Sequence, residues 1–309
     1  MGSYRPDMHR TAETVKCLST VQPCIKMGEL TQDLRAQRDA WDEANERHHG
    51  NPLRSVVSVD DLNTIYIDGS QKRLVSRAVR LEPHFTVLDY GCGVGRWTLW
   101  FAPEVHRVVG VDLSPGMVEA ARRMAGNTGI QNAEHHTIEG MPFPFEDDAF
   151  DLVNAVWVLR YIIDDGELAR TVEEICRVVR PGGHVTFIEM IAKKEPEFKE
   201  HEGVFTGAAV YRRLEQYRSL FEGCGMMMKM SAVSSASPLY WLYALIRDAA
   251  KRRSLPDPFS PLAPSIVSAS LAAESLTATP MRLLADRGLI RCRHRFLCLQ
   301  KPGGDRTRS

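Results

Sequence analysis

The chain contains 309 residues, of which 44% are hydrophobic and 25% charged, the composition of a globular protein with a sizeable core. Its 39 Lys and Arg residues balance its 39 Asp and Glu residues, so no overall field favours nucleic acid or an anionic membrane as a partner. Small neutral or zwitterionic substrates fit this balance better than polymers.

The seven Cys residues are scattered, and none forms a C-x-x-C pair of the kind that binds zinc or carries redox chemistry. Reduced thiols are therefore expected. The N-terminal region lacks the uninterrupted apolar core of a signal peptide, and no segment looks long and apolar enough to span a bilayer. These features predict a cytoplasmic protein without a membrane anchor.

The first part of the chain is expected to form an arm and a helical cap. Residues 1–28 mix charges, proline and isolated cysteines without a sustained period, which is typical of a flexible arm. From Leu30 the apolar spacing predicts an amphipathic helix that ends near Pro52, and a second helix follows Ser70. Residues 29–83 form the predicted cap.

A glycine-rich segment then follows an apolar run. Residues 89–95 read D-Y-G-C-G-V-G and are entered from F-T-V-L at 85–88. Alternating glycines let the backbone turn sharply and approach a ligand closely, so the segment predicts a strand, a tight loop and a helix. A dinucleotide loop would read G-x-G-x-x-G, but here Arg96 replaces the third glycine and Asp89 would repel phosphate. The pattern favours a cationic nucleoside ligand.

Strands and helices alternate after this loop. Helices are predicted after Ser114, which is a good N-cap, and over residues 167–179, before the turn at Pro181. Strands separated by helices imply right-handed crossovers and a parallel sheet that is covered on both faces. The predicted strands are 107–112, 134–138, 150–156 and 184–189.

The last part of the chain predicts a helix over 211–221, a strand over 227–233 and a closing strand over 293–299. Residues 237–289 are too long for a hairpin turn and contain an apolar helix. They are predicted to form a lid insertion over the substrate. The catalytic core would then comprise residues 84–236 and 290–301.

These stretches resemble the class I S-adenosylmethionine-dependent methyltransferases, of the small-molecule type that acts on quinones and natural products. Residues 89–95 match the family's D/E-x-G-x-G-x-G loop, residues 150–153 resemble its F-D-x-V segment, and residues 180–183 its R-P-G-G turn. The resemblance covers roughly residues 74–191. It implies an α/β fold: a Rossmann-like three-layer sandwich with a mostly parallel seven-stranded sheet and an antiparallel last strand.

The resemblance also implies S-adenosyl-L-methionine as the cofactor. Asp112 stands at the carboxyl end of the second predicted strand, where a carboxylate can accept both ribose hydroxyls. The adenine-binding stretch departs from the family, because Thr137 stands where an acid is common, and whether Thr137 or Glu139 reaches the adenine is left open. The predicted cofactor-binding residues are Asp89, Gly91, Gly93, Gly95, Asp112, Leu113, Ile138, Glu139 and Ala155.

The acceptor is expected to be a small organic molecule, methylated at C, N or O by in-line displacement without a metal. Residues 154–157 are not the [DN]-P-P-[YF] tetrad that receives the amino group of a nucleobase or glutamine, and no acidic cluster resembles a magnesium site. Several aromatic residues favour a flat acceptor, such as an aromatic or indole-like intermediate of natural-product biosynthesis.

Four residues are candidates for catalysis, each with a structural alternative. Glu189 is the first choice, because ligands gather outside the carboxyl ends of parallel strands, but it could be a structural acid at a strand end. Tyr66 and Tyr161 could equally be packed aromatic residues, and His48 could belong to a solvated helix end. The predicted catalytic residues are Glu189, Tyr161, His48 and Tyr66.

Three other functions stay open. An RNA or protein methyltransferase would need a basic groove or an added module, and the basic groups at 251–253 and 291–295 are interpreted as solvated faces. A non-catalytic S-adenosylmethionine-binding protein would lack an open pocket beside the methyl group. A nicotinamide dehydrogenase would bind NAD. We also leave open whether the protein forms a homodimer.

Overall fold

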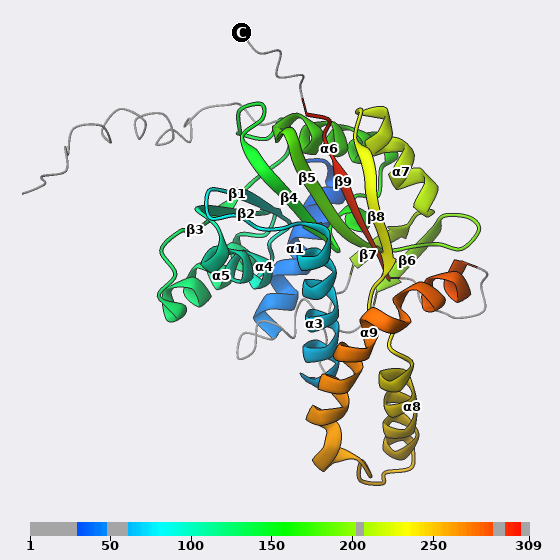
Figure 1. Cartoon of the computed structure of the whole chain (residues 1–309). Helices are drawn as coiled ribbons and strands as arrows, with labels where there is room; N and C mark the ends of the chain where they lie inside the picture. Colours follow the sequence, from blue (N-terminus) through cyan, green and yellow to red (C-terminus); the bar gives the residue numbers. More distant parts are fainter. Residues whose placement is uncertain (1–29, 48–60, 202–206, 287–293, 304–309) are drawn as a thin grey trace, which may run out of the picture.

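A seven-stranded sheet forms the centre of the computed structural model, which describes residues 30–47, 61–201, 207–286 and 294–303 (Figure 1). Its strand order is β3-β2-β1-β4-β5-β9-β8, and β9 runs antiparallel to both neighbours while the first five strands are parallel. The predicted fold class is confirmed. The strands are β1 Thr86–Tyr90, β2 Arg107–Asp112, β3 Ala133–Thr137, β4 Phe150–Val156, β5 Val179–Met190, β8 Met227–Val233 and β9 His294–Gln300.

Helices cover both faces of this sheet. Successive strand residues point to opposite faces, so Val87 packs in one core cluster and Leu88 in the other. The Val87 face is covered by α3 (Asp61–Ala78) and α4 (Arg96–Phe101), and the Leu88 face by α6 (Asp165–Val178) and α7 (Leu214–Gly223). Both faces of the parallel strands are therefore buried, as the strand–helix alternation predicts.

The helix after β2 begins where its N-cap predicts. In α5 (Pro115–Thr128), the Ser114 hydroxyl accepts a hydrogen bond from the Met117 N–H at 3.0 Å, and Gly129 ends the helix with a φ of +71°. This cap fixes the direction in which the chain leaves Asp112.

The cap helix α1 (Gln32–Arg47) lies against the start of α5. The Asp42 carboxylate accepts from the Gly116 N–H at 2.9 Å and from the Ser114 hydroxyl, and the Asn45 amide donates to the Gly116 carbonyl at 3.1 Å. The predicted first helix is thus confirmed, while α3 begins nine residues earlier than Ser70. The predicted arm at 1–28 and His48 lie outside the described residues.

The ribbon described next and the helix α9 (Ala263–Asp286) were not predicted, whereas α8 (Pro238–Arg252) corresponds to the apolar helix expected after residue 237. A two-stranded antiparallel ribbon, β6 (Glu197–His201) with β7 (Gly207–Tyr211), follows β5, so Tyr211 lies in a strand and α7 begins only at Leu214. Residues 237–286 form these two helices, which we call the hairpin; Figure 1 shows it extending away from the sheet alongside α3.

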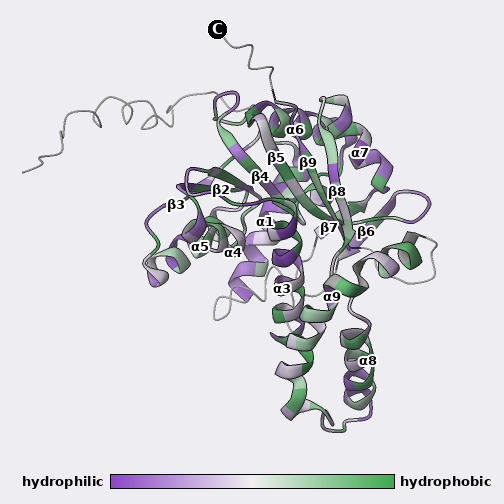
Figure 2. Cartoon of the chain, viewed as in Figure 1, coloured by the Kyte–Doolittle hydropathy of each residue, from purple (hydrophilic) through white to green (hydrophobic). Residues whose placement is uncertain are grey.

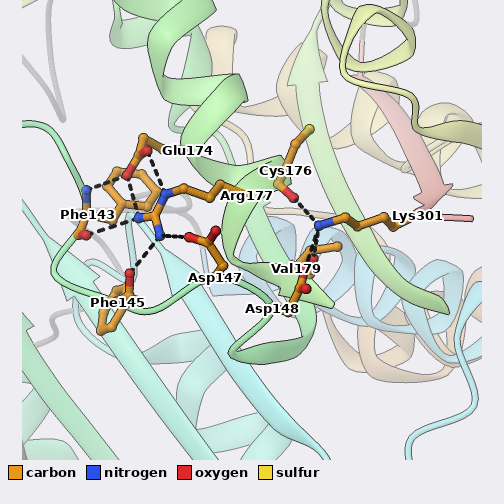
Figure 3. Close-up of polar contacts among 9 residues, drawn as sticks. All are labelled: Phe143, Phe145, Asp147, Asp148, Glu174, Cys176, Arg177, Val179 and Lys301. Carbon is orange, nitrogen blue, oxygen red and sulfur yellow. Dashed lines mark hydrogen bonds and ion pairs between the residues drawn. The ribbon is translucent and has the colours of Figure 1, made fainter. Parts of the chain in front are cut away.

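A polar network fixes the loop between β3 and β4. Arg177 on α6 donates to the carbonyls of Phe143 and Phe145, at 3.2 and 2.8 Å, and pairs with Asp147 and Glu174 (Figure 3). The Glu174 carboxylate also accepts from the Phe143 N–H at 2.6 Å. Because Phe143 lines the cavity described below, this network holds one wall of the candidate site.

Within the described ranges, no helix combines the length and the apolar character that crossing a bilayer requires.

Candidate cofactor and acceptor site

A cavity of about 320 Å³ lies at the carboxyl ends of β1, β2 and β4, beneath α1. This is the edge at which open parallel sheets bind ligands, and the volume is typical of small-molecule sites. The cavity is lined by residues of α1, of the glycine loop, of the turn after β2, of the segment after β3 and of the segment after β4.

The glycine loop forms one wall of the cavity. Gly91, Gly93 and Gly95 have φ values of +71°, +52° and +83°, in the left-handed region that favours glycine. A Cβ atom on Gly91 would lie 2.6 Å from the side chain of Val158. Of the three glycines predicted to bind the cofactor, Gly91 and Gly93 line the cavity, whereas Gly95 lies behind it, against Ala121 and His135.

Asp112 is tied to this loop. One carboxylate oxygen accepts from the Gly93 N–H at 2.8 Å, and the other accepts from the Ser114 N–H at 2.9 Å. Burial raises the pKa of Asp112 to about 6, although both backbone bonds oppose this shift. Asp112 and Leu113, both predicted to bind the cofactor, line the cavity.

The prediction that Asp89 contacts the cofactor directly is not supported. Asp89 is buried in the sheet and does not line the cavity. Its carboxylate accepts from the Thr98 hydroxyl at 2.8 Å and from the Asn154 amide at 3.1 Å. Burial raises its pKa. Asp89 therefore anchors α4 and β4 behind the loop and acts on any ligand through the loop backbone.

The segment after β3 provides an apolar wall. Four residues of this segment line the cavity: Ile138, which was predicted to bind the cofactor, Gly140, Met141 and Phe143. Glu139 is exposed, and neither Glu139 nor Thr137 lines the cavity, so neither candidate for the adenine amino group is placed there.

Ala155 was predicted to bind the cofactor, but it is fully buried inside β4 and does not line the cavity. The three residues that line the cavity after it are Val156, Trp157 and Val158.

A buried cation and several aromatic rings line the opposite end. The Arg160 guanidinium donates to the Tyr161 hydroxyl at 2.6 Å, and its carbon lies 5.5 Å from the centre of the Trp157 ring. Trp41 on α1 packs edge-on against Tyr161, with 5.2 Å between ring centres. Burial alone would lower the pKa of Arg160. The Tyr161 hydroxyl and the Glu189 carboxylate nearby more than offset this, so the pKa of Arg160 is raised above its usual value. All except Glu189 line the cavity.

Trp157 has a backbone conformation that bulky residues rarely adopt. Its φ is +59°, in the left-handed region, and its N–H donates to the Ile188 carbonyl at 2.9 Å. Such strain persists only where the surroundings enforce it, and it concentrates at functional sites. Trp157 is one of the aromatic residues that the sequence suggested for the pocket wall, but its backbone conformation could not be foreseen, since a positive φ is not readable from a tryptophan.

Glu189 does not face the cavity. Its Oε1 accepts from the Leu159 N–H at 2.7 Å, and the side chain is fully buried. Burial raises its pKa to about 7, and the nearby Arg160 charge opposes this rise. Glu189 thus holds the turn that carries Arg160 and Tyr161, a supporting position rather than a substrate-facing one.

Tyr66 also lies away from the cavity. Its hydroxyl donates to Glu274 of α9 at 2.9 Å and accepts from the Ser237 N–H at 2.7 Å, and its ring stacks on Tyr240 at 3.8 Å. No described residue of the hairpin lines the cavity. The lid prediction is therefore not supported, because the hairpin packs on α3. Of the three predicted catalytic residues that the structure describes, Glu189, Tyr161 and Tyr66, only Tyr161 lines the cavity.

Residues 87–183 match the family model of a methyltransferase domain. They form a class I S-adenosylmethionine-dependent methyltransferase domain. The chain is 30% identical to the uncharacterised methyltransferase YcgJ of Bacillus subtilis over 142 residues, which are 44% of this chain and 54% of that protein. It is 36% identical to the demethylmenaquinone methyltransferase of Symbiobacterium thermophilum over 112 residues, 35% of this chain and 43% of that one. It spans about half the length of these relatives.

The methyltransferase domain has the fold of several solved structures. The [4+2]-cyclase SpnF has a TM-score of 0.58 and 19% identity, over 90% of this chain and 99% of that one. An N-methyltransferase 2 of Haemonchus contortus, in complex with phosphomonomethylethanolamine and S-adenosylhomocysteine, has a TM-score of 0.52 and 17% identity. The match covers 86% of this chain and 60% of that one. At this identity the likeness concerns the fold.

The cavity fits the cofactor of the methyltransferase domain. The glycine loop lets the backbone approach a ligand at a point that a side chain would fill. Asp112 offers carboxylate oxygens for ribose hydroxyls, and the apolar wall of Ile138, Met141 and Phe143 suits a nucleobase. Among the residues that the structure describes, no group of three or more His, Cys, Asp and Glu side chains is arranged to hold a metal ion.

Proposed function

We propose that the protein transfers the methyl group of S-adenosyl-L-methionine to a flat, largely apolar small molecule that carries an acidic oxygen. One observation carries this proposal: a single cavity joins the Asp112 side of the site to the buried Arg160–Tyr161 pair. The cofactor supplies an activated methyl group on a positively charged sulfur, which leaves as a neutral sulfide. Relatives named as demethylmenaquinone methyltransferases support a quinone-like acceptor.

The charges in the cavity support an acceptor with an acidic oxygen. A buried guanidinium attracts a phenolate or an enolate oxygen and repels a protonated amine. Arg160 is 8% exposed and stays charged, since its pKa is raised further by its neighbours. Trp41, Trp157 and Tyr161 offer ring faces and edges against which a flat molecule can stack.

The residues of the cavity would act mainly by positioning. Displacement at a methyl carbon needs the acceptor atom, the carbon and the sulfur in line, and holding this geometry can account for much of the rate. The new bond would form as the carbon–sulfur bond breaks, the electron pair of that bond would pass to sulfur, and the acceptor would lose one proton to water. Arg160 would lower the pKa of the acceptor hydroxyl, so that this proton is lost before or during transfer.

Two of the alternatives named above lose support. The open cavity beside the glycine loop supports a catalytic role over a purely cofactor-binding one. The cavity lining carries two arginines, Arg96 and Arg170, besides Arg160, and Arg96 is paired with Asp68 at 2.7 Å. This is no extended basic groove for RNA.

The experiment is a screen of phenols, quinols, indoles and amines with the purified chain and the methyl donor, with products read by mass spectrometry. We expect methylated phenolic or enolic products and none from the amines. Arg160→Gln should lower turnover of the accepted substrate at least about a hundredfold, with Arg160→Lys intermediate. Binding of S-adenosylhomocysteine should stay within about threefold for both variants. Turnover of amines in preference to phenols would contradict the proposed acceptor.

A further inference from the structure

The far end of the hairpin exposes apolar and basic side chains together. We call residues 251–262 the hairpin tip; Figure 1 shows this connection between α8 and α9 at the end most distant from the sheet. Leu255, Phe259 and Leu262 in the tip are 57%, 36% and 56% exposed. Large apolar side chains grouped on a protruding turn mark an interaction surface more often than isolated ones do.

Three consecutive cations begin the tip. Lys251, Arg252 and Arg253 are exposed, and within the described residues no carboxylate forms an ion pair with them. The tip contains one acid, Asp257, which accepts from the Tyr243 hydroxyl and from the Phe259 N–H, both at 2.9 Å. The tip therefore carries a net charge of three minus one, or +2, although the whole chain is neutral.

The apolar surface continues along α8. Its buried side presents Tyr240 and Tyr243 to α3 and α9, whereas Leu242 and Leu245 on another side are 57% and 63% exposed. Figure 2 shows hydrophobic residues along both helices of the hairpin. The solvent-exposed side of α8 thus carries leucines, whereas the exposed side of an amphipathic helix normally carries polar residues.

The hairpin is held firmly at its base. Glu274 of α9 accepts from the hydroxyls of Tyr66 and Ser70 on α3, both at 2.9 Å, and from the Ala236 N–H at 3.0 Å. These buried bonds fix the direction in which the tip projects, so its apolar and basic side chains are presented as one surface.

We propose that the hairpin tip docks on an anionic lipid surface. Leu255, Phe259 and Leu262 would enter the boundary between headgroups and acyl chains, while the three cations would contact lipid phosphates. A second copy of the chain that paired through α8 is a poorer occupant, because the one carboxylate of that helix, Asp248, is already paired with Arg247 at 3.3 Å. From the sequence, the basic group at 251–253 was interpreted as a solvated face, because the exposure of Leu255, Phe259 and Leu262 beside it is seen only in the structure.

Vesicle sedimentation of the full chain tests the proposal. Vesicles of phosphatidylcholine mixed with phosphatidylglycerol should bind the protein, and binding should weaken with added salt. Phosphatidylcholine alone should bind it much less. Replacing Lys251, Arg252 and Arg253 together with Ser should weaken binding about tenfold to a hundredfold. Leu255→Ser with Leu262→Ser should weaken it by a similar factor.

Leu276→Ser is the matched control, because Leu276 is 82% exposed on α9 but lies outside the tip. It should bind vesicles like the wild type. Retained S-adenosylhomocysteine binding shows that each variant is folded, since no tip residue lines the cavity. As a second measurement, brominated lipids should quench Phe259→Trp more than Leu276→Trp.

Equal binding of both vesicle types, or unchanged binding by the tip variants, would overturn the proposal. So would a dimer in light scattering that the tip variants convert to monomer without any vesicle binding, since the tip would then be a contact between copies.

Discussion

The N–H of Gly93 donates to Asp112 Oδ2 at 2.8 Å, so the glycine loop after β1 and the acid at the end of β2 form one unit. The same carboxylate holds the Ser114 N–H at the start of α5. Asp112 therefore orders the loop after β1, and in the proposed complex its remaining lone pairs would accept the ribose hydroxyls. We expect a change at this residue to weaken contacts on both sides of the cofactor.

The pH dependence of cofactor binding is the first prediction. The pKa of Asp112 is raised to about 6, so the carboxylate is ionised above that pH and protonated below it. Because a carboxylate accepts ribose hydroxyls better when ionised, S-adenosylhomocysteine affinity should be constant above pH 7 and fall by up to about tenfold per pH unit below pH 6. Calorimetric titration at several pH values measures this.

Asp112→Asn is the matched variant for this titration. It should bind S-adenosylhomocysteine about tenfold to a hundredfold more weakly at neutral pH, with little change between pH 5 and 7. A wild-type pH profile that persists in the variant would assign the titration to another group.

The second prediction concerns Gly91→Ala. A Cβ there would strain a φ of +71° and meet Val158 at 2.6 Å, so the free energy of unfolding should fall by about 2–4 kcal/mol. Gly129→Ala is the control, since Gly129 has the same φ with no atom within 4 Å of the added Cβ. It should lose only about 1–2 kcal/mol. Equal losses in urea unfolding would show that the contact with Val158 is not tight.

The third prediction concerns Glu189→Gln. The folded-state pKa of Glu189 is raised to about 7, so its favourable contribution to stability is fully present below the unfolded-state pKa and is lost as pH rises through 7. Glutamine does not titrate. Measured by unfolding in urea, the free-energy difference between wild type and variant should therefore shift in favour of the variant from pH 5 to pH 8. A pH-independent difference would mean that Glu189 titrates normally.

The fourth prediction concerns the network in Figure 3. Arg177→Ala removes the bonds to the Phe143 and Phe145 carbonyls and to Asp147 and Glu174, and it should cost about 1–3 kcal/mol of stability. Since Phe143 lines the cavity, cofactor affinity should fall as well. Arg218→Ala, which breaks an exposed pair with Glu222 at 2.7 Å, should change stability by less than about 0.5 kcal/mol. Similar losses in both variants would contradict this role of the network.

Most of the core was predictable, because continuous apolar runs have few alternatives to a buried strand. The bounds of β2, β4 and β8 agree with the predicted ranges. The ribbon of β6 and β7 was missed because Glu197–His201 contains a single apolar residue, Phe198, and so has no apolar periodicity. The start of α3 was missed because Asp61 resembles a loop residue. The burial of residues that follow it, such as Tyr66, depends on contacts with α9 that the sequence does not reveal.

The site was predictable in part. The glycine pattern and an acid at the end of the next strand could be recognised in the sequence. The structure places three of the residues chosen in this way, Gly91, Gly93 and Asp112, in the cavity wall. The motif does not say which way a carboxylate points, and Asp89 turns inward to Thr98 and Asn154. Tyr66 was misplaced because its partner Glu274 lies 208 residues away in the sequence. Such long-range pairs leave no local signal.

Calorimetric titration of the purified chain with S-adenosylhomocysteine and, separately, with NAD tests the central claim most directly. The account predicts saturable binding of S-adenosylhomocysteine at one site and no measurable binding of NAD. Saturable binding of NAD with no heat from S-adenosylhomocysteine would contradict it.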